Sequence, residues 1–146
     1  MSGNSARDDQ EMNTLTLPRP LVNTILAQAQ QSPEHEVCGL IGGRGGQALN
    51  CYPVDNTALD QARRYQMDPR AQIETMRRMR DRGEQLMAIY HSHPHAPALP
   101  SATDLREAAY PDAVYLIVSL NTVGVLEMTA FHIKDKQAHE IALELA

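Results

Sequence analysis

The sequence contains too few cysteines for a cysteine-based site. Only Cys38 and Cys51 occur in 146 residues, and they do not form a CxxC pair. A cysteine-rich zinc knuckle and a dithiol redox centre both require that spacing, and a small secreted scaffold requires several disulfides. The sequence therefore excludes these three classes.

A basic surface, a leader peptide and a long apolar run are also missing. The formal net charge is −5, whereas proteins that bind nucleic acids neutralise phosphates with a broad basic surface. The N-terminal segment lacks the basic head and apolar run of a signal peptide, and no apolar stretch approaches the length that spans a membrane. We therefore expect a cytoplasmic protein with neither nucleic acid nor membrane as a partner.

Several enzyme motifs are absent as well. The glycine-rich segment 42–46 is not followed by the Lys-Ser/Thr of a phosphate-binding loop, so it predicts a hairpin connection. Neither the His-Glu-x-x-His of thermolysin-like proteases nor the Pro-Cys-x-x-Cys of zinc deaminases occurs. Arginines cluster in residues 77–82, where they form either a solvated helix face or a docking patch for an acidic partner.

What is present fits one globular domain. With 146 residues, of which 42% are hydrophobic, the chain can bury one core but is too short for two. Residues 1–13 are polar and nearly free of large apolar side chains, so we expect a disordered tail there. Residues 14–146 are expected to form a single domain.

Apolar periodicity and turn residues predict three helices and five or six strands. The helices are expected within residues 17–31, 67–83 and 101–111. The strand candidates lie within residues 36–43, 47–54, 85–93, 113–120, 125–133 and 137–145. In the second helix, the core-facing residues are predicted to be Met67, Ile73, Met76 and Met79. Because strands and helices come in runs rather than in strict alternation, the fold class is α+β or mixed α/β.

Three histidines stand close together at the end of the strand predicted at 85–93. His91 and His93 are two residues apart on an extended chain, so their imidazoles project from the same face, as two ligands of one ion require. His95 would lie roughly 13 Å from His91 at about 3.3 Å per residue, and Pro94 interrupts the run. We therefore expect His95 to be a loop residue or a substrate contact.

A third ligand can come from the start of the helix predicted at 101–111. Ser101 and Asp104 are three residues apart, so their side chains share a face of its first turn. The alternative is that they only cap the helix, because serine followed three residues later by an acid is a common capping arrangement. With Asp104, the histidine pair would give an N,N,O set around Zn²⁺ with a fourth position for water, as in catalytic zinc sites.

These residues together match a known motif. His91-Ser-His93-Pro is followed at fixed spacing by Ser101 and Asp104, and Glu36 stands upstream in EVCGLIGG. On this motif the sequence resembles the JAMM (MPN+) metalloprotease family, from about Leu15 to the C-terminus. The resemblance implies a curved mixed sheet flanked by helices, related to the cytidine-deaminase sandwich.

The resemblance also implies roles for these residues. His91, His93 and Asp104 match the zinc ligands, Glu36 matches the general base, and Ser101 matches the residue whose hydroxyl assists the tetrahedral intermediate. Cys38 is expected in the core rather than as a nucleophile, because no base is placed for it.

The family implies a substrate class too. Its members cleave peptide or isopeptide bonds after the C-terminal Gly-Gly of ubiquitin-like proteins. The short chain and the segments RRYQMDP and YPDAVYLIVSL make it most similar to small bacterial members that release cysteine from a ubiquitin-like sulfur-carrier protein. Two alternatives stay open: an isopeptidase that removes ubiquitin-like modifiers from proteins, and a non-catalytic binding or scaffold module. We also allow for a homodimer.

Overall fold

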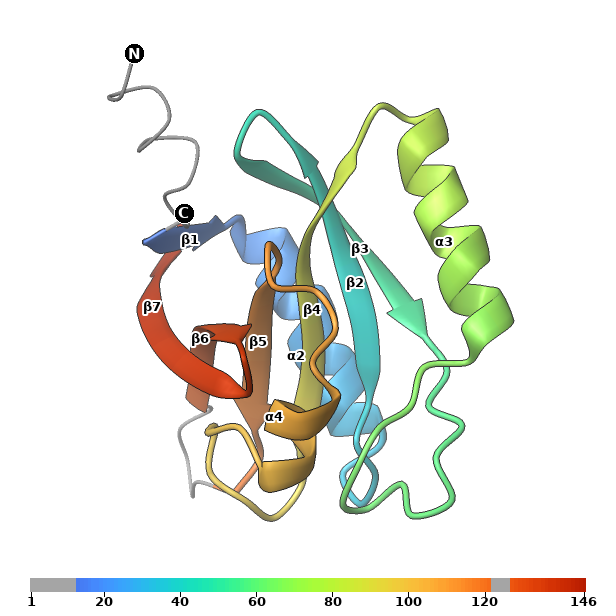
Figure 1. Cartoon of the computed structure of the whole chain (residues 1–146), viewed down its shortest axis with the longest axis vertical. Coiled ribbons are helices and arrows are strands. Elements are labelled where there is room, and N and C mark those ends of the chain that lie inside the picture. Colours follow the sequence, from blue (N-terminus) through green and yellow to red (C-terminus); the bar gives the residue numbers. More distant parts are fainter. Residues whose placement is uncertain (1–12, 122–126) are drawn as a thin grey trace.

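The computed structural model describes residues 13–121 and 127–146, which form one curved sheet with three helices (Figure 1). Of the predicted tail, residues 1–12 lie outside the described residues, and the carbonyl of Asn13 accepts a hydrogen bond from the N–H of Ala142. In the described part of the chain, no helix combines the length and the apolarity needed to cross a membrane.

The sheet mixes parallel and antiparallel neighbours. Its strands stand in the order β1-β7-β6-β5-β4-β2-β3. They span Thr14–Leu17 (β1), Cys38–Arg44 (β2), Gln47–Val54 (β3), Gln85–His93 (β4), Val114–Ser119 (β5), Glu127–Lys134 (β6) and Gln137–Leu145 (β7). The pairs β4–β5 and β1–β7 are parallel, and the other pairs are antiparallel. The predicted mixed sheet is therefore confirmed.

The helices cover both faces of the sheet. Helix α2 (Arg19–Gln31) buries Leu21 and Ile25 on one face, in a core that includes Leu116. Helix α3 (Pro69–Asp81) and helix α4 (Ala102–Glu107) contribute Met79 and Leu105 to a second core on the other face. Helix α4 therefore covers the face of the sheet to which side chains at the end of β4 point. This brings the polar residues of the two elements together.

Helix α3 begins and ends where the sequence predicts. The Asp68 carboxylate accepts a hydrogen bond from the N–H of Ala71, and Pro69 occupies the first turn. Gly83 follows the helix with φ of +73°, a conformation that glycine adopts without strain.

One of the four residues predicted to face the core from the second helix, Ile73, is exposed. Met67 and Met79 are buried and Met76 packs against the core, but the Ile73 side chain is 60% exposed. Thr75 and Met79 define the buried face, and Ile73 lies two residues from Thr75, on nearly the opposite side of the helix. Because α3 has apolar residues on both faces, the sequence pattern does not indicate which face packs inward.

Two other elements differ from the prediction. Strand β1 was not predicted, and it forms because its four residues pair in parallel with Ala142–Leu145 of β7. Helix α4 ends at Glu107 rather than near residue 111, because the N–H groups of Ala109 and Tyr110 donate to the Tyr115 hydroxyl instead of to helix carbonyls. Of the strand predicted at 125–133, residues 125 and 126 lie outside the described residues.

Candidate metal centre

Strand β4 delivers two histidines to one buried point. His91 and His93 are 1% and 3% exposed, and their Nε2 atoms lie 3.1 Å apart. Ser92, between them, points the other way, and its hydroxyl accepts a hydrogen bond from the N–H of Val37 at 2.9 Å. The backbone N–H of Ser92 in turn donates a hydrogen bond to the Val37 carbonyl. The alternation of β4 thus presents two imidazoles on one side and fixes the segment next to Glu36 on the other.

Asp104 reaches the histidines from the first turn of α4. Its Oδ2 atom lies 3.1 Å from Nε2 of both His91 and His93. The same oxygen accepts from the N–H of Ser101, whose hydroxyl accepts from the N–H of Asp104, so the two residues form a capping box. Ser101 and Asp104 therefore cap α4, and the same capping arrangement directs the Asp104 carboxylate toward the two histidines.

The three candidate ligand atoms, Nε2 of His91 and His93 and Oδ2 of Asp104, have the spacing that a tetrahedral ion requires. Nitrogen and oxygen ligands at 2.0–2.1 Å from zinc lie about 3.3 to 3.4 Å from one another, close to the 3.1 Å separations found here. His93 Nδ1 lies 2.8 Å from the Pro97 carbonyl, which only an N–H can satisfy. A neutral His93 therefore turns its Nε2 lone pair toward the Asp104 carboxylate, and two acceptors at this distance need a cation or a proton between them.

Glu36 lies beside this group without joining its hydrogen bonds. One of its carboxylate oxygens is within 4.8 Å of a ring nitrogen of both His91 and His93. The residue is 5% exposed, and its Oε1 atom has no hydrogen-bond partner among the described residues. Burial raises the pKa of Glu36 to about 8. The arrangement therefore contains a second buried carboxyl group, which holds a proton more tightly than an ordinary glutamate does.

The other pKa shifts follow from burial and from the close contacts. Burial lowers the pKa of His91 below its usual value. Burial alone would raise the pKa of Asp104, but the close contacts with His91 and His93 outweigh it and hold that pKa well below its ordinary range. Burial opposes the charged form of His93, yet its contacts with Asp104 and Pro97 raise its pKa overall. Asp104 is therefore the permanent anion of the group.

A loop before α3 closes over the histidines. Asn56 organises it, because its side-chain amide donates to the carbonyls of Glu36 and Arg64, at 2.9 and 3.1 Å. The Asn56 Oδ1 atom accepts from the N–H groups of Ala58 and Gln66, both at 3.0 Å. One side chain thus connects the backbone of Glu36 to the turn that carries residue 65.

Tyr65, which this loop carries, packs directly on a histidine. Its ring stacks on that of His91 with 4.4 Å between centroids and an interplanar angle of 25°. Burial raises the pKa of the Tyr65 hydroxyl well above its usual value, so it stays protonated.

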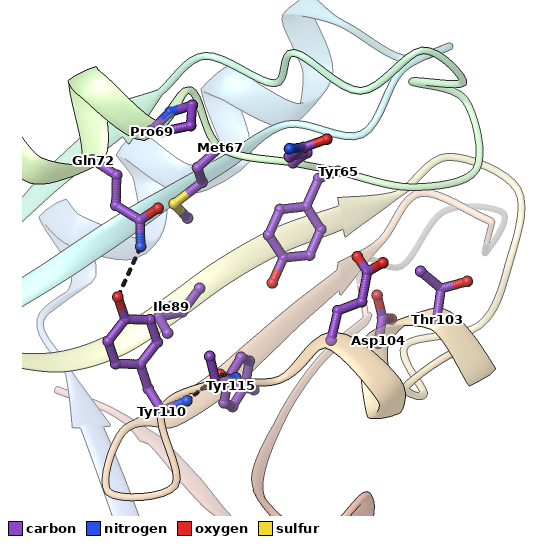
Figure 2. A pocket seen from close by; sticks show the side chains of 12 residues that line it. Tyr65, Met67, Pro69, Gln72, Ile89, Thr103, Asp104, Tyr110 and Tyr115 are labelled. Atoms are coloured by element: carbon purple, nitrogen blue, oxygen red, sulfur yellow. Dashed lines mark hydrogen bonds between the residues drawn. The ribbon is translucent and has the colours of Figure 1, made fainter.

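A cavity of about 330 Å³ opens beside Asp104, between this loop and the segment that follows α4 (Figure 2). Its walls include Met67, Ile89 and three tyrosines. Of the twelve residues that line it, none is lysine, arginine or histidine. Two of them, Asp104 and Glu107, are acidic, so the cavity disfavours an anionic ligand.

The remaining predicted residues lie close to the site or in the core. His95 is exposed and its Nε2 lies 3.1 Å from the Glu34 carboxylate, away from the ligand group. Cys38 is fully buried, and its thiol donates to the Val54 carbonyl. Burial raises the pKa of this thiol to about 12, so the expectation of a core cysteine is confirmed.

Sequence reasoning gave no role to Asn56, Tyr65 or Ser92. Asn56 and Tyr65 belong to a polar linker without periodicity, and Ser92 is a small residue inside an apolar strand. Ser92 had one signal, since alternation along β4 requires it to face away from its two histidine neighbours.

Comparison with known proteins agrees with this geometry. The family of prokaryotic homologues of the JAB domain matches residues 18–133. The CysO-cysteine peptidase of Mycobacterium tuberculosis is 33% identical over 125 residues, which cover 83% of this chain and 84% of that protein. The desampylase of Haloferax volcanii is 32% identical over 111 residues, which cover 72% and 80% respectively.

A solved structure is similar over most of the chain. The solution structure of a protein from Desulfitobacterium hafniense is 36% identical, with a TM-score of 0.80 and coverage of 90% of this chain and 92% of that one. The family match spans most of the chain, and relatives above 30% identity cover more than two thirds of it. The chain therefore belongs to the prokaryotic JAB family of JAMM/MPN metalloproteases.

Proposed function

We propose that the chain is a zinc-dependent peptidase that hydrolyses the bond after the C-terminal Gly-Gly of a ubiquitin-like protein. The observation that carries this proposal is the group formed by His91, His93 and Asp104, whose ligand atoms are mutually 3.1 Å apart. Glu36 lies beside the group, and one of its carboxylate oxygens has no hydrogen-bond partner among the described residues. A scaffold module would have no need to keep such a set buried together.

The zinc ion would be held by His91, His93 and Asp104. Glu36 would transfer protons, and Ser101 would stabilise the negative charge on the carbonyl oxygen. Bound zinc supplies a water of lowered pKa and polarises the scissile carbonyl. Glu36 takes a proton from the attacking water as the new carbon–oxygen bond forms. The Ser101 hydroxyl, whose oxygen accepts from the N–H of Asp104, still has its own proton to donate to the negative carbonyl oxygen. Glu36 then gives its proton to the leaving nitrogen as the carbon–nitrogen bond breaks.

The cavity beside Asp104 supports an extended, neutral tail as the substrate. Two glycines add no side chains and no charge, which suits walls of Met67, Ile89 and tyrosine without a cationic residue. Strands β4 and β5 form part of its floor through Ile89 and Tyr115, so the tail can lie alongside the sheet as extended peptides commonly do.

The leaving group is proposed to be cysteine carried by a ubiquitin-like sulfur-carrier protein. The similarity to a CysO-cysteine peptidase over 83% of this chain supports it. A second candidate is an isopeptidase that removes a ubiquitin-like modifier from proteins, the same hydrolysis with a larger leaving group. The similarity to a desampylase at nearly equal identity supports this alternative.

Intact-mass analysis of CysO carrying a C-terminal cysteine tests the proposal. Zinc-quantified protein is expected to remove one cysteine, and a chelator is expected to stop the reaction. Zinc-loaded protein that leaves CysO-cysteine intact but releases a lysine-linked conjugate would establish the isopeptidase instead. Protein that binds no zinc and cleaves neither substrate would reject the peptidase and favour a scaffold.

A further inference from the structure

The hydroxyl groups of the three tyrosines in the cavity differ in one respect. The Tyr110 hydroxyl accepts a hydrogen bond from the Gln72 amide at 3.1 Å. The Tyr115 hydroxyl accepts from the N–H groups of Ala109 and Tyr110, both at 3.0 Å. The Tyr65 hydroxyl has no hydrogen-bond partner among the described residues and points into the cavity (Figure 2). A tyrosine placed in this way is available to a ligand.

The ring of the same tyrosine contacts a proposed zinc ligand that lacks the usual support. Histidines that bind metals are normally oriented by a hydrogen bond from their second ring nitrogen. His93 has this bond, to the Pro97 carbonyl, but the buried Nδ1 of His91 has no partner among the described residues. The Tyr65 ring instead stacks on the face of the His91 ring, with 4.4 Å between the ring centroids.

The loop holds Tyr65 from both sides. Asn56 donates to the carbonyl of Arg64 and accepts from the N–H of Gln66, the two neighbours of Tyr65 in the chain. The backbone bridge between Asn56 and Met67 closes the same turn. Tyr65 is thus presented on a hydrogen-bonded turn, which lowers the entropic cost of using it in binding.

We propose that Tyr65 has two separable tasks: its ring positions His91 for the metal, and its hydroxyl hydrogen-bonds the backbone of the glycine tail in the cavity. The second task rests on the proposed function for its substrate, whereas the first concerns only the chain and its metal. A neutral backbone carbonyl is a ligand group that a protonated phenol recognises in a cavity without cationic side chains.

Two substitutions separate these tasks. Tyr65→Phe keeps the ring and removes the hydroxyl, so zinc affinity is expected to stay unchanged while kcat/KM for CysO-cysteine falls about three- to tenfold, the loss of one hydrogen bond. Tyr65→Leu removes the ring as well, so zinc affinity is expected to fall about tenfold. Zinc affinity is measured by competition with a chromogenic chelator, and circular dichroism verifies that each variant is folded.

Tyr110→Phe is the matched control, because it removes a hydroxyl from the same cavity that already has a protein partner. Its kcat/KM is expected to change much less than that of Tyr65→Phe. A Tyr65→Phe enzyme as fast as wild type would reject the substrate contact, and a Tyr65→Leu protein with wild-type zinc affinity would reject the positioning role. If wild type fails to cleave CysO-cysteine, the proposed function fails, while the zinc measurement still decides the role of the ring.

Discussion

Glu36 and Asp104 are both buried carboxylates beside the two histidines, but their surroundings differ. Asp104 Oδ2 lies 3.1 Å from both imidazole nitrogens and also accepts from the N–H of Ser101. Glu36 makes no such contact, and one of its oxygens has no partner at all among the described residues. A ligand must touch the ion, whereas a general base must reach a water next to it, so we propose Asp104 as the ligand and Glu36 as the base.

Replacing Glu36 with glutamine is expected to remove turnover while zinc remains bound. The change preserves shape but removes the group that accepts the proton, and general base catalysis contributes about 100-fold to 10,000-fold in rate. Atomic emission measures whether zinc is retained, and intact-mass analysis measures whether CysO-cysteine is cleaved. Glu34→Gln is the control, since Glu34 is exposed and pairs with the exposed His95 rather than with His91 or His93. A Glu36→Gln protein that retains full activity would show that another group takes the proton.

The sequence predicted part of the site residue by residue, and the part it missed has a physical cause. His91, His93 and Asp104 could be grouped because strand alternation and the first turn of a helix fix where side chains point. Asn56 and Tyr65 could not, because their contacts depend on how a loop without periodicity folds across distant segments. The Asn56 amide donates to Glu36, twenty residues away in the chain.

Among the elements, the loop between β3 and α3 depends most on a single side chain. Asn56→Ala removes four hydrogen bonds to backbone groups, those of Glu36, Arg64, Ala58 and Gln66. We expect the free energy of unfolding to fall by roughly 1 to 3 kcal/mol, the usual cost of leaving such groups unpaired. We also expect kcat/KM to fall, because Tyr65 and Glu36 lose their common support. Urea denaturation and cleavage of CysO-cysteine measure the two effects.

Asn50→Ala provides the comparison for this loop. Asn50 is also hydrogen-bonded, to Glu84 at 2.6 Å, but it lies on β3 away from the end of the sheet that carries the histidines. This variant should lose stability and keep its activity when folded. Equal losses of activity in the two variants would mean that the Asn56 loop has no special role in the site.

Helix α3 allows a direct test of which face packs inward. Met79 is 2% exposed and Ile73 is 60% exposed, although both are apolar residues of one helix. Met79→Ala is expected to lower the free energy of unfolding by roughly 2 to 5 kcal/mol through loss of core contacts. Ile73→Ala should change it by no more than about 0.5 kcal/mol. Urea denaturation compares the two variants, and a large cost for Ile73→Ala would contradict the orientation of α3.

At the scale of the whole molecule, the sequence predicted the class of fold but not its strand order. Periodicity is local, so it placed six strands and three helices nearly where they occur. Strand order depends on pairings between distant segments, such as β1 with β7, and no local pattern encodes these. The consequence for function is large, because the parallel pairing of β4 with β5 makes the chain cross over through α4 and return Asp104 to the histidines.

The same topology predicts how metal affects stability. The proposed ligands come from two elements that meet only in the folded protein, so zinc is expected to stabilise the native state by mass action, by about 2.7 kcal/mol when free zinc is 100-fold above its Kd. The two hydrophobic cores on opposite faces of the sheet contain none of the proposed ligands. Chelation is therefore expected to lower Tm by about 10 °C while far-ultraviolet circular dichroism at 25 °C stays unchanged.

Two variants test which carboxylate is responsible for the change of Tm on chelation. Asp104→Asn should abolish it, because a proposed ligand is lost, and Glu36→Gln should keep it, because the base is outside the ligand set. If Glu36→Gln abolished the shift as Asp104→Asn does, Glu36 would be a ligand, and the proton would have to be taken by a different residue. If chelation left Tm unchanged in the wild-type protein, the group of atoms 3.1 Å apart would be a hydrogen-bonded cluster rather than a metal centre.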